Sequence, residues 1–326
     1  MVKENMPASR MRHRRFLPTV ALAAGLLLSG CEFLGLDIFP ATLQNAKGSI
    51  DLDSRVAGQD GAAISSVEEI VRLSSSAAGK AYLFVLCGTD LGARLIVLDP
   101  ESLATEAYLS ASGLGTPLAV DASGYFVAGS ARIDPSSLAP VGTDFSSGAF
   151  LLPAASMNLL LSGSNGALNI KTCDAAWSAA PVALPISGIS VTGSASTYNL
   201  VDAELSEDGA LLLLFHDTSQ HELELGFSDY SHFAASIGSL SAAADTKTEL
   251  SGIPDSRAWL CAGGIVAPSY DNDSRLVRYG YGKGASLDSR QFRSEWVRGL
   301  SFDYGEKGWY YYDSRSGRLY AMGVWW

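Results

Sequence analysis

Charged residues are scarce in this 326-residue chain, and their scarcity narrows the fold class. Only 17% of the residues are Asp, Glu, Lys or Arg, whereas 47% are hydrophobic and 33 are glycine. A hydrophobic content this high excludes a mainly disordered chain. Helix surfaces usually carry many Glu and Lys residues, while abundant Gly, Ser and Ala suit closely packed strands joined by tight turns. The composition therefore favours an all-β fold.

Motifs of several enzyme and metal-binding classes are also missing. The chain has no CxxC pair, no Walker A sequence, no G-x-S-x-G elbow and no HExxH. Gly280, Gly282 and Gly284 do not form a dinucleotide fingerprint, because no helical pattern follows them. The acceptor-rich segment 270–273 lacks the glycine and the distal Glu of an EF-hand loop. We therefore predict no catalytic residue and no cofactor, and we lean against an enzyme.

Residues 1–30 have the three parts of a signal peptide. A positive region from Arg10 to Arg15 precedes an apolar run from Leu17 to Leu28, and Leu28-Ser29-Gly30-Cys31 ends the leader. The apolar run is too short to cross ~30 Å of hydrocarbon as a helix. The final tetrapeptide resembles a bacterial lipobox, in which signal peptidase II cleaves before the cysteine. The resemblance implies cleavage between Gly30 and Cys31, and a lipid on Cys31.

The mature chain is strongly acidic. The leader contains five basic residues and one acidic residue, so 18 basic and 33 acidic residues remain, with a formal charge of −15. This charge repels nucleic-acid phosphates and anionic head groups, so we predict no nucleic-acid partner and membrane association through lipidated Cys31 alone. Glu32 follows Cys31 in place of Asp, which favours the outer membrane if the host is Gram-negative.

Three cysteines remain in the mature chain, each in or beside an apolar stretch. An odd number leaves at least one thiol unpaired in an oxidising compartment. Buried free thiols are the favoured interpretation, and one disulfide is the alternative. The residues are Cys87, Cys173 and Cys261.

From about residue 66, short β-rich runs alternate with turn clusters at a period of about 40 residues. The first unit has four predicted strands, and two Asp-Pro-x-Ser turns, at Asp99 and Asp134, lie 35 residues apart. A recurrence of this length with four strands in each unit is typical of a β-propeller. The predicted units cover residues 68–109, 117–137, 147–188, 196–238, 248–292 and 295–326.

A short step recurs within these units and carries a resemblance. Residues 121–127 and 207–213 share the pattern of an acidic residue, a glycine and an apolar run, and 304–311 echo it. This step resembles the first-to-second-strand step of NHL- and YVTN-like propeller repeats. The resemblance implies an all-β propeller of six blades, within a range of five to seven, built from four-stranded antiparallel sheets. Paired β-sandwich domains are the alternative.

The expected organisation has three parts. Residues 1–30 form the cleaved signal peptide, residues 31–60 a lipidated tether with a possible closing strand, and residues 61–326 the propeller. The last unit lacks a fourth strand, and the stretch around Ile50 could complete it. Such closure protects sheet edges that otherwise invite aggregation.

Three local patterns have both a functional and a structural interpretation. His216 and His221 could offer two imidazoles to a metal, but we favour an exposed turn that they flank. Asp-Ser-Arg could be a recognition element, but we favour turn chemistry in which Arg begins the next strand. The tripeptide occurs at 53–55, 255–257, 273–275, 288–290 and 313–315.

The aromatic-rich end could dock a glycan or a protein, but core packing is the favoured interpretation. Its residues are Trp296, Trp309, Tyr310, Tyr311, Tyr312, Tyr320, Trp325 and Trp326.

Three functions are compatible with these features. The favoured one is a membrane-anchored, non-enzymatic scaffold that binds another envelope protein or a glycan. The alternative is a hydrolase or lyase of a sugar or lactone at the channel mouth, which requires carboxylates or a histidine to converge. The third is substrate capture for uptake, which requires a deep pocket lined by aromatic residues.

Overall fold

The computed structural model describes residues between 46 and 322, so the predicted signal peptide and lipobox lie outside the described residues. Within the described part, no helix is long and apolar enough to cross a membrane. The described residues are 46–142, 150–154, 157–164, 167–183, 186–187, 198–205, 210–217, 224–232, 240–241, 246–250, 259–261, 264–268, 275–280, 286–291, 297–303, 308–314 and 316–322.

Six four-stranded sheets, here called blades 1 to 6, follow one another along the described residues. Blade 1 contains β2 (Ile64–Ser75), β3 (Lys80–Thr89), β4 (Gly92–Leu98) and β5 (Thr105–Leu109). Blade 2 contains β6 (Leu118–Val120), β7 (Phe126–Ala128), β8 (Ala131–Ile133) and β9 (Pro140–Gly142). Blade 3 contains β10 (Phe150–Ala154), β11 (Met157–Ser164), β12 (Ala167–Asp174) and β13 (Val182–Ala183).

The second half of the unit repeats the same plan. Blade 4 contains β15 (Tyr198–Leu205), β16 (Ala210–Asp217), β17 (Glu224–His232) and β19 (Thr246–Leu250). Blade 5 contains β20 (Trp259–Cys261), β21 (Gly264–Pro268), β22 (Arg275–Gly280) and β23 (Ser286–Gln291). Blade 6 contains β24 (Val297–Asp303), β25 (Gly308–Asp313), β26 (Arg318–Met322) and β1 (Ala46–Asp51). A parallel pair of short strands, β14 (Ile186–Ser187) and β18 (Leu240–Ser241), is additional.

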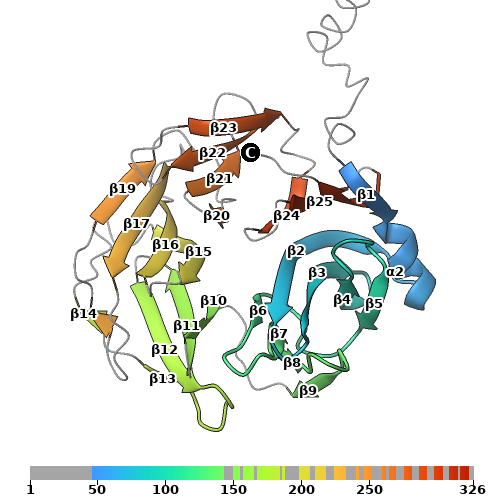
Figure 1. Cartoon of the computed structure of the whole chain (residues 1–326), viewed down its shortest axis with the longest axis horizontal. Coiled ribbons are helices and arrows are strands. Elements are labelled where there is room, and N and C mark those ends of the chain that lie inside the picture. Colours follow the sequence, from blue (N-terminus) through green and yellow to red (C-terminus); the bar gives the residue numbers. More distant parts are fainter. Residues whose placement is uncertain are drawn as a thin grey trace, which may run out of the picture. The chain divides into compact units, whose positions relative to one another are not determined.

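The first strands of neighbouring blades contact one another at five of the six junctions (Figure 1). These contacts join β24 to β2, β2 to β6, β6 to β10, β10 to β15, and β15 to β20. Every strand pair within a blade is antiparallel, as consecutive strands joined by short turns require. This arrangement is a six-bladed β-propeller, so the predicted fold class is confirmed and the sandwich alternative is wrong.

An N-terminal strand closes the last blade. β1 pairs with β26 in an antiparallel register that places Ile50 opposite Leu319 and Asp51 opposite Arg318. Ile50 and Leu319 are both buried, so the closure is apolar as well as hydrogen-bonded. The predicted closing strand around Ile50 is therefore found, on the outer side of blade 6.

A helix, α2 (Leu52–Asp60), follows this strand where the sequence analysis placed only a tether. Asp51 caps its N-terminus by accepting a hydrogen bond from the Ser54 amide, and Gly61 ends it in the left-handed conformation at φ 78°. These are the ordinary start and stop signals of a helix, and with only nine residues between them no long periodic pattern reveals it. Leu52 and Val56 are fully buried and face the blades.

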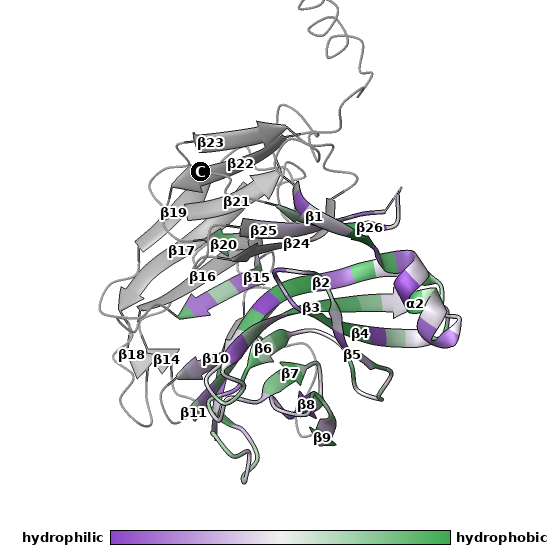
Figure 2. Ribbon diagram, turned by 45° about the vertical axis from the view of Figure 1, so that its right-hand side comes forward, coloured by the Kyte–Doolittle hydropathy of each residue, from purple (hydrophilic) through white to green (hydrophobic). Residues whose placement is uncertain are grey.

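The apolar core lies between neighbouring blades. One buried cluster joins blade 1 to α2 and blade 6, and a second joins blade 1 to blade 2. β3 contributes to both, because six consecutive residues from Tyr82 to Cys87 are buried and alternate between its two faces. Figure 2 shows hydrophobic residues concentrated along β3 and β4, whereas the surface of α2 is mixed.

Two predicted unit boundaries are wrong. The second unit was predicted to end at residue 137, whereas β9 pairs with β8 as the fourth strand of blade 2. The fifth unit was predicted to begin at residue 248, whereas β19 pairs with β17 as the fourth strand of blade 4. The preceding segment contains no strong turn signal, so the spacing alone led to the wrong division. The predicted limits of the first, third and sixth units lie within a few residues of the strands observed there.

Candidate functional site

Two carboxylates on first strands mark the inner side of the ring. Glu69 lies on β2 of blade 1 and Asp202 on β15 of blade 4, and each follows a β-bulge. The bulges fall between Val67 and Glu69 and between Leu200 and Asp202. A bulge re-aims the side chain that follows it and is common beside functional sites.

Each of these carboxylates accepts a backbone hydrogen bond from the following blade. Glu69 Oε2 accepts from the Leu118 amide on β6 at 3.0 Å. Asp202 Oδ2 accepts from the Leu260 amide on β20 at 2.7 Å, and its Oδ1 accepts from the Ala203 amide at 2.8 Å. The two side chains therefore connect blade 1 to blade 2 and blade 4 to blade 5.

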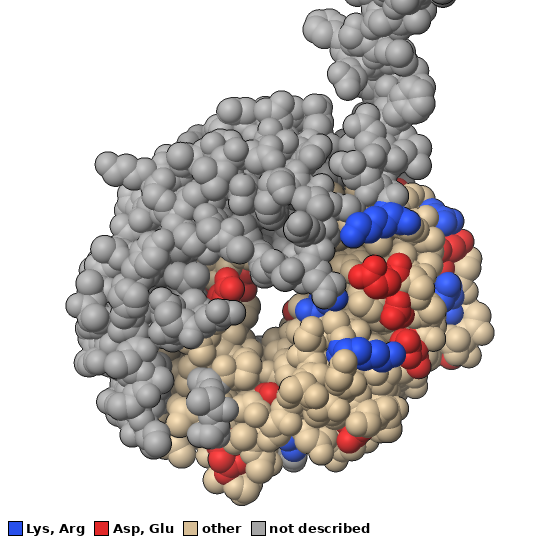
Figure 3. Space-filling model, in the orientation of Figure 1, with Lys and Arg blue, Asp and Glu red and all other residues tan. Residues whose placement is uncertain are grey.

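Both carboxylates favour the protonated form. Desolvation raises the pKa of Glu69 to about 8, and the negative charges of Asp202 and Glu68 add to this effect. Desolvation likewise raises the pKa of Asp202 to about 7, although its two backbone hydrogen bonds oppose the shift. Burial also raises the pKa of Glu204, two residues further along β15. Figure 3 shows an opening in the middle of the ring, and acidic side chains lie at its edge.

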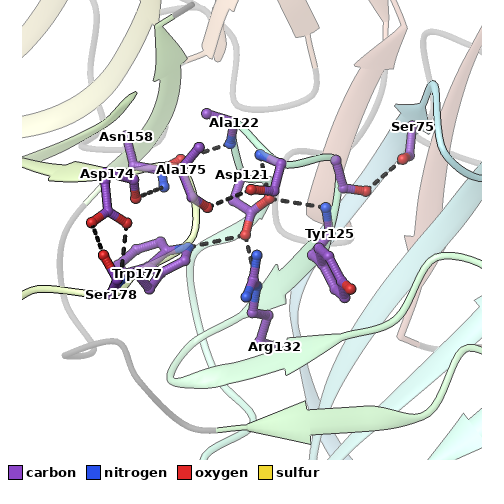
Figure 4. A network of polar contacts seen from close by, with 12 residues as sticks. Ser75, Asp121, Ala122, Tyr125, Arg132, Asn158, Asp174, Ala175, Trp177 and Ser178 are labelled. Carbon is purple, nitrogen blue, oxygen red and sulfur yellow. Dashed lines mark hydrogen bonds and ion pairs between the residues drawn. The ribbon is translucent and has the colours of Figure 1, made fainter. Parts of the chain in front are cut away.

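A third carboxylate, the buried side chain of Asp121, is the centre of a polar network (Figure 4). Its Oδ1 accepts from the amides of Ser123 and Tyr125, both at 2.9 Å, and so holds the turn between β6 and β7. Its Oδ2 accepts from Arg132 Nε at 2.8 Å and from Trp177 Nε1, beyond β12, at 3.0 Å. The acidic residue of the predicted propeller step therefore connects blade 2 to blade 3.

Other polar contacts support the same junctions. The Ala122 amide donates to Asn158 Oδ1 at 2.7 Å, and Ser123 Oγ donates to the Ala175 carbonyl at 2.6 Å. Ser75 Oγ donates to the Gly124 carbonyl at 2.5 Å, which adds a contact between blades 1 and 2. Glu69, Asp121 and Asp202 thus follow one rule, in which a carboxylate of one blade accepts from a donor of the next.

The junction between blades 6 and 1 uses different groups. The amides of Leu52 and Asp53 donate to the Gly317 carbonyl at 2.9 and 3.3 Å. Tyr312 Oη donates to Asp53 Oδ1 at 2.7 Å, and Tyr310 Oη donates to the Pro100 carbonyl at 3.0 Å. These contacts, together with the buried face of α2, form what we call the seam.

The residues singled out for lipidation and metal binding fall largely outside the described part. Gly30, Cys31 and His221 lie outside it, and of His216 only the backbone, on β16 opposite Asn199 and Leu225, is described. Among the described residues, no three His, Cys, Asp or Glu side chains gather as a metal site requires. The lipid and metal assignments remain predictions.

Two of the three cysteines are buried free thiols, as expected. Burial raises the pKa of Cys87 to about 12 and that of Cys173 to about 11, so both thiols stay protonated and unreactive. The side chain of Cys261 lies outside the described residues.

The Asp-Ser-Arg tripeptides do not share one structure. Residues 53–55 lie within α2 and residues 288–290 within β23, so the turn interpretation is wrong for these two copies. It is correct at Asp313, whose Oδ2 accepts from Ser316 Oγ at 2.7 Å in the turn before β26. Arg275 begins β22, as expected.

The aromatic residues of β25 belong to the core. Trp309, Tyr310, Tyr311 and Tyr312 are all buried, and Tyr311 stacks on Tyr320 with ring centroids 5.0 Å apart. Core packing is therefore confirmed for these residues, while Trp296, Trp325 and Trp326 lie outside the described part.

Comparisons with known proteins find distant structural similarity only. No protein-family model and no curated protein matches the chain. Among solved structures, the β-propeller domain of Myceliophteria thermophila Cps50 (Swd1) is 14% identical, with a TM-score of 0.44, covering 86% of this chain and 99% of that one. BamB from Moraxella catarrhalis is 11% identical, with a TM-score of 0.41, covering 82% of this chain and 84% of that one. The fold assignment rests on the sheets and pairings described above.

Proposed function

We propose that the protein is an exported lipoprotein, cleaved after Gly30 and lipidated on Cys31, whose propeller is a non-enzymatic binding scaffold in the cell envelope. The observation that carries this proposal is the position of β1. The chain that follows the predicted tether enters the ring at once and closes it by pairing with β26. The anchored end of the chain is thereby built into the scaffold.

The tether keeps the scaffold near the membrane. Fourteen residues, 32–45, separate Cys31 from β1. At 3.3–3.6 Å for each residue, the fully extended segment reaches about 50 Å. β1 therefore lies within about that distance of the bilayer, which keeps a partner bound to the propeller near other envelope components and raises its effective concentration there.

The use of the carboxylates also supports a scaffold. Glu69, Asp121 and Asp202 each accept a hydrogen bond that connects neighbouring blades. Groups held in this way stiffen the ring, and a stiff ring presents its loops in a constant arrangement, which lowers the entropic cost of binding. We place the protein in the outer membrane if the host is Gram-negative, with an envelope protein or a glycan as its partner.

One observation favours a second function. Glu69 and Asp202 come from blades that are three positions apart in the six-bladed ring, and the charge of one raises the pKa of the other. Glycoside hydrolysis uses two carboxyl groups whose environments separate their pKa values, and the pKa values of Glu69 and Asp202 are raised to about 8 and about 7. The second candidate is therefore a hydrolase or lyase of a sugar or lactone at the channel mouth.

Cross-linking in cells tests the proposed function. The tagged full chain is cross-linked, purified and identified by mass spectrometry, with Cys31→Ala as the unanchored variant and Cys87→Ala as the matched cysteine control. We expect a stoichiometric envelope partner with the wild type and Cys87→Ala, and loss of that partner with Cys31→Ala. Intact mass of the purified protein should show the diacylglyceryl mass on the mature chain only when Cys31 is present.

Two results would overturn parts of this proposal. If the mature wild-type chain carries no lipid, the proposed membrane anchor is wrong. Recovery of the protein alone, combined with turnover of a glycoside or lactone that Glu69→Gln and Asp202→Asn abolish, would replace the scaffold with the hydrolase.

A further inference from the structure

A recess lies between α2 and the outer strands of blade 1. Its volume is about 320 Å³, at the lower end of the range for small-ligand sites. One wall is the exposed face of α2, and the other is formed by β4 and β5. The lining residues are Ser54, Arg55, Gly58, Gln59, Ile96, Thr105 and Tyr108.

Arg55 supplies a positive charge at this recess. Its Nη1 donates to the neutral Thr105 Oγ1 at 2.6 Å across the recess, which positions the guanidinium. Within the described part of the chain no carboxylate forms an ion pair with Arg55. A guanidinium has five N–H donors, so four remain after the bond to Thr105. Carboxylates fit this fork in a bidentate manner.

Asp60, which contacts Tyr108 of the recess, is already paired with a cation. Asp60 accepts from Arg94 Nε at 2.7 Å, from Tyr108 Oη at 2.9 Å and from the Ala62 amide at 3.1 Å. The hydrogen bond from Arg94 is the main reason that the pKa of Asp60 lies below its ordinary value. These bonds also hold the Tyr108 ring as one wall of the recess. Asp60 therefore shapes the recess without cancelling the charge of Arg55.

Gly58 lines the recess. It lies in the interior of α2, where glycine is less favourable than alanine. A Cβ atom at Gly58 would meet nothing within 4 Å, so no packing contact requires a glycine there. The helix therefore contains a glycine that lowers its stability and leaves a space unfilled in the recess.

We propose that this recess binds a carboxylated sugar ring. The carboxylate pairs with Arg55, the ring hydroxyls exchange hydrogen bonds with Ser54 and Gln59, and the apolar ring face lies against Tyr108. Figure 3 shows Lys and Arg side chains interspersed with Asp and Glu over this part of blade 1. The ligand carboxylate is therefore selected by its pairing with Arg55 and not by a broad positive potential. The inference deepens the proposed function by naming a ligand class for the scaffold.

Isothermal titration and NMR line-shape measurements on the detergent-purified full chain test the proposal. The probes are D-glucuronate, D-glucose as its uncharged analogue, and acetate as a carboxylate without a ring. We expect glucuronate to bind with a Kd of about 1 mM, as an open site of this size allows. Glucose and acetate should each bind at least about tenfold more weakly, because each lacks one half of the recognised chemistry.

Matched variants separate the site from the fold. Arg55→Gln should weaken glucuronate about tenfold or more and leave glucose unchanged. Gly58→Phe should abolish binding by filling the recess, whereas Gly58→Ala should bind within about twofold of wild type, since a methyl group occupies little of the volume. All three variants should keep the thermal transition of the wild type or exceed it, because Gly58 and Arg55 are exposed.

The outcomes also distinguish sources and proposals. A glucuronate-containing tetrasaccharide that binds much more tightly than the monosaccharide would identify an envelope polymer as the source, and equal affinities would identify a free sugar acid. Equal binding of glucose and glucuronate, or full binding by Arg55→Gln or Gly58→Phe, would overturn the site. These titrations contain no partner protein. If glucuronate does not bind, the recess is excluded as its site, but the cross-linking test of the proposed function is unaffected.

Discussion

Two junctions of the ring join neighbouring blades through different kinds of contact. One is the seam between blades 6 and 1, and the other is the junction between blades 2 and 3. At the second junction a buried carboxylate, Asp121, joins Arg132 on its own blade to Trp177 on the next. At the seam a helix inserts two fully buried apolar side chains, Leu52 and Val56. Blades 2 and 3 are consecutive in the chain, whereas blades 6 and 1 meet only through non-covalent contacts and β1.

This difference between polar and apolar junctions indicates that the propeller has its strongest non-covalent contact where the ring closes. Consecutive blades cannot diffuse apart, so polar contacts that set their angle are sufficient. The contacts at the closing junction have to offset the entropy lost when distant segments are brought together. Burial of apolar surface can do this because it is the dominant favourable contribution to folding. Substitutions at the two junctions should therefore differ in kind as well as in size.

Removal of the buried carboxylate should have the largest effect. Asp121→Ala removes a fully buried carboxylate that accepts hydrogen bonds from Arg132 and Trp177, and we expect a loss of about 3–5 kcal/mol in the free energy of unfolding. Urea unfolding followed by tryptophan fluorescence measures it. Asp134→Ala removes a similar turn acceptor in an exposed turn and should cost clearly less. Equal losses would mean that the network of Figure 4 does not hold the junction.

Truncation at the seam should follow. Leu52→Ala removes a fully buried side chain from the cluster shared by α2, blade 1 and blade 6, and should cost about 3 kcal/mol. Leu91→Ala, at an exposed leucine of blade 1, is the control and should change stability by less than about 0.5 kcal/mol. A Leu52→Ala protein as stable as the control would show that the helix does not contribute to closure.

A glycine at the seam should be less tolerant than a matched glycine elsewhere. Gly317 has φ +65°, and a Cβ there would lie 2.5 Å from Asp53 Oδ2. Gly79 has φ +68° with nothing within 4 Å of the added atom. Gly79→Ala should cost about 1 kcal/mol for backbone strain, and Gly317→Ala about 1 kcal/mol more for the displaced helix. Thermal unfolding of both variants measures the difference, and identical midpoints would contradict the close approach.

Stability should fall as the pH rises from about 4 to about 8. The folded chain keeps protons on Glu69 and Asp202, whose pKa values are about 8 and 7, whereas the unfolded chain releases them near pH 4. The stabilisation is complete below the unfolded pKa and is lost as the pH passes the folded pKa. We expect Tm at pH 8.5 to lie a few degrees below Tm at pH 5.5.

The amide double variant, Glu69→Gln with Asp202→Asn, is the control for this pH dependence. It should flatten the profile between pH 5.5 and 8.5, because an amide cannot ionise. An unchanged slope in the double variant would assign the pH dependence to other acidic groups of this strongly acidic chain.

Repetition in the sequence predicts the blades, but the blade junctions depend on contacts that have no local signal. The turns at Asp99 and Asp134 were predicted because Asp and Ser bond to their own backbone: Asp99 Oδ1 accepts from the Ser102 amide at 2.7 Å and Asp134 Oδ1 from the Ser137 amide at 2.8 Å. Glu69 and Asp202 carried no such signal, since their donors lie 49 and 58 residues away.

The helix α2 shows a different limit. Its cap at Asp51 and its end at Gly61 were readable, but the strand pattern that precedes it led to a prediction of a tether. The recess beside Arg55 was not predictable, because its walls come from α2 and from β4 and β5, whose lining residues are up to about 50 positions apart. Only the fold brings Gly58 and Tyr108 to one site.

Hydrogen exchange of the full chain tests most directly whether β1, which follows the predicted tether, is built into the ring. The comparison is between β1, the outer strand of blade 6, and β13, the outer strand of blade 3. The account predicts that the hydrogen-bonded amides of β1 exchange together with those of β26, at the rate of global unfolding, while those of β13 exchange faster. Rapid exchange of β1, with β24, β25 and β26 still protected, would contradict it, because the tether would then lead to a detachable strand.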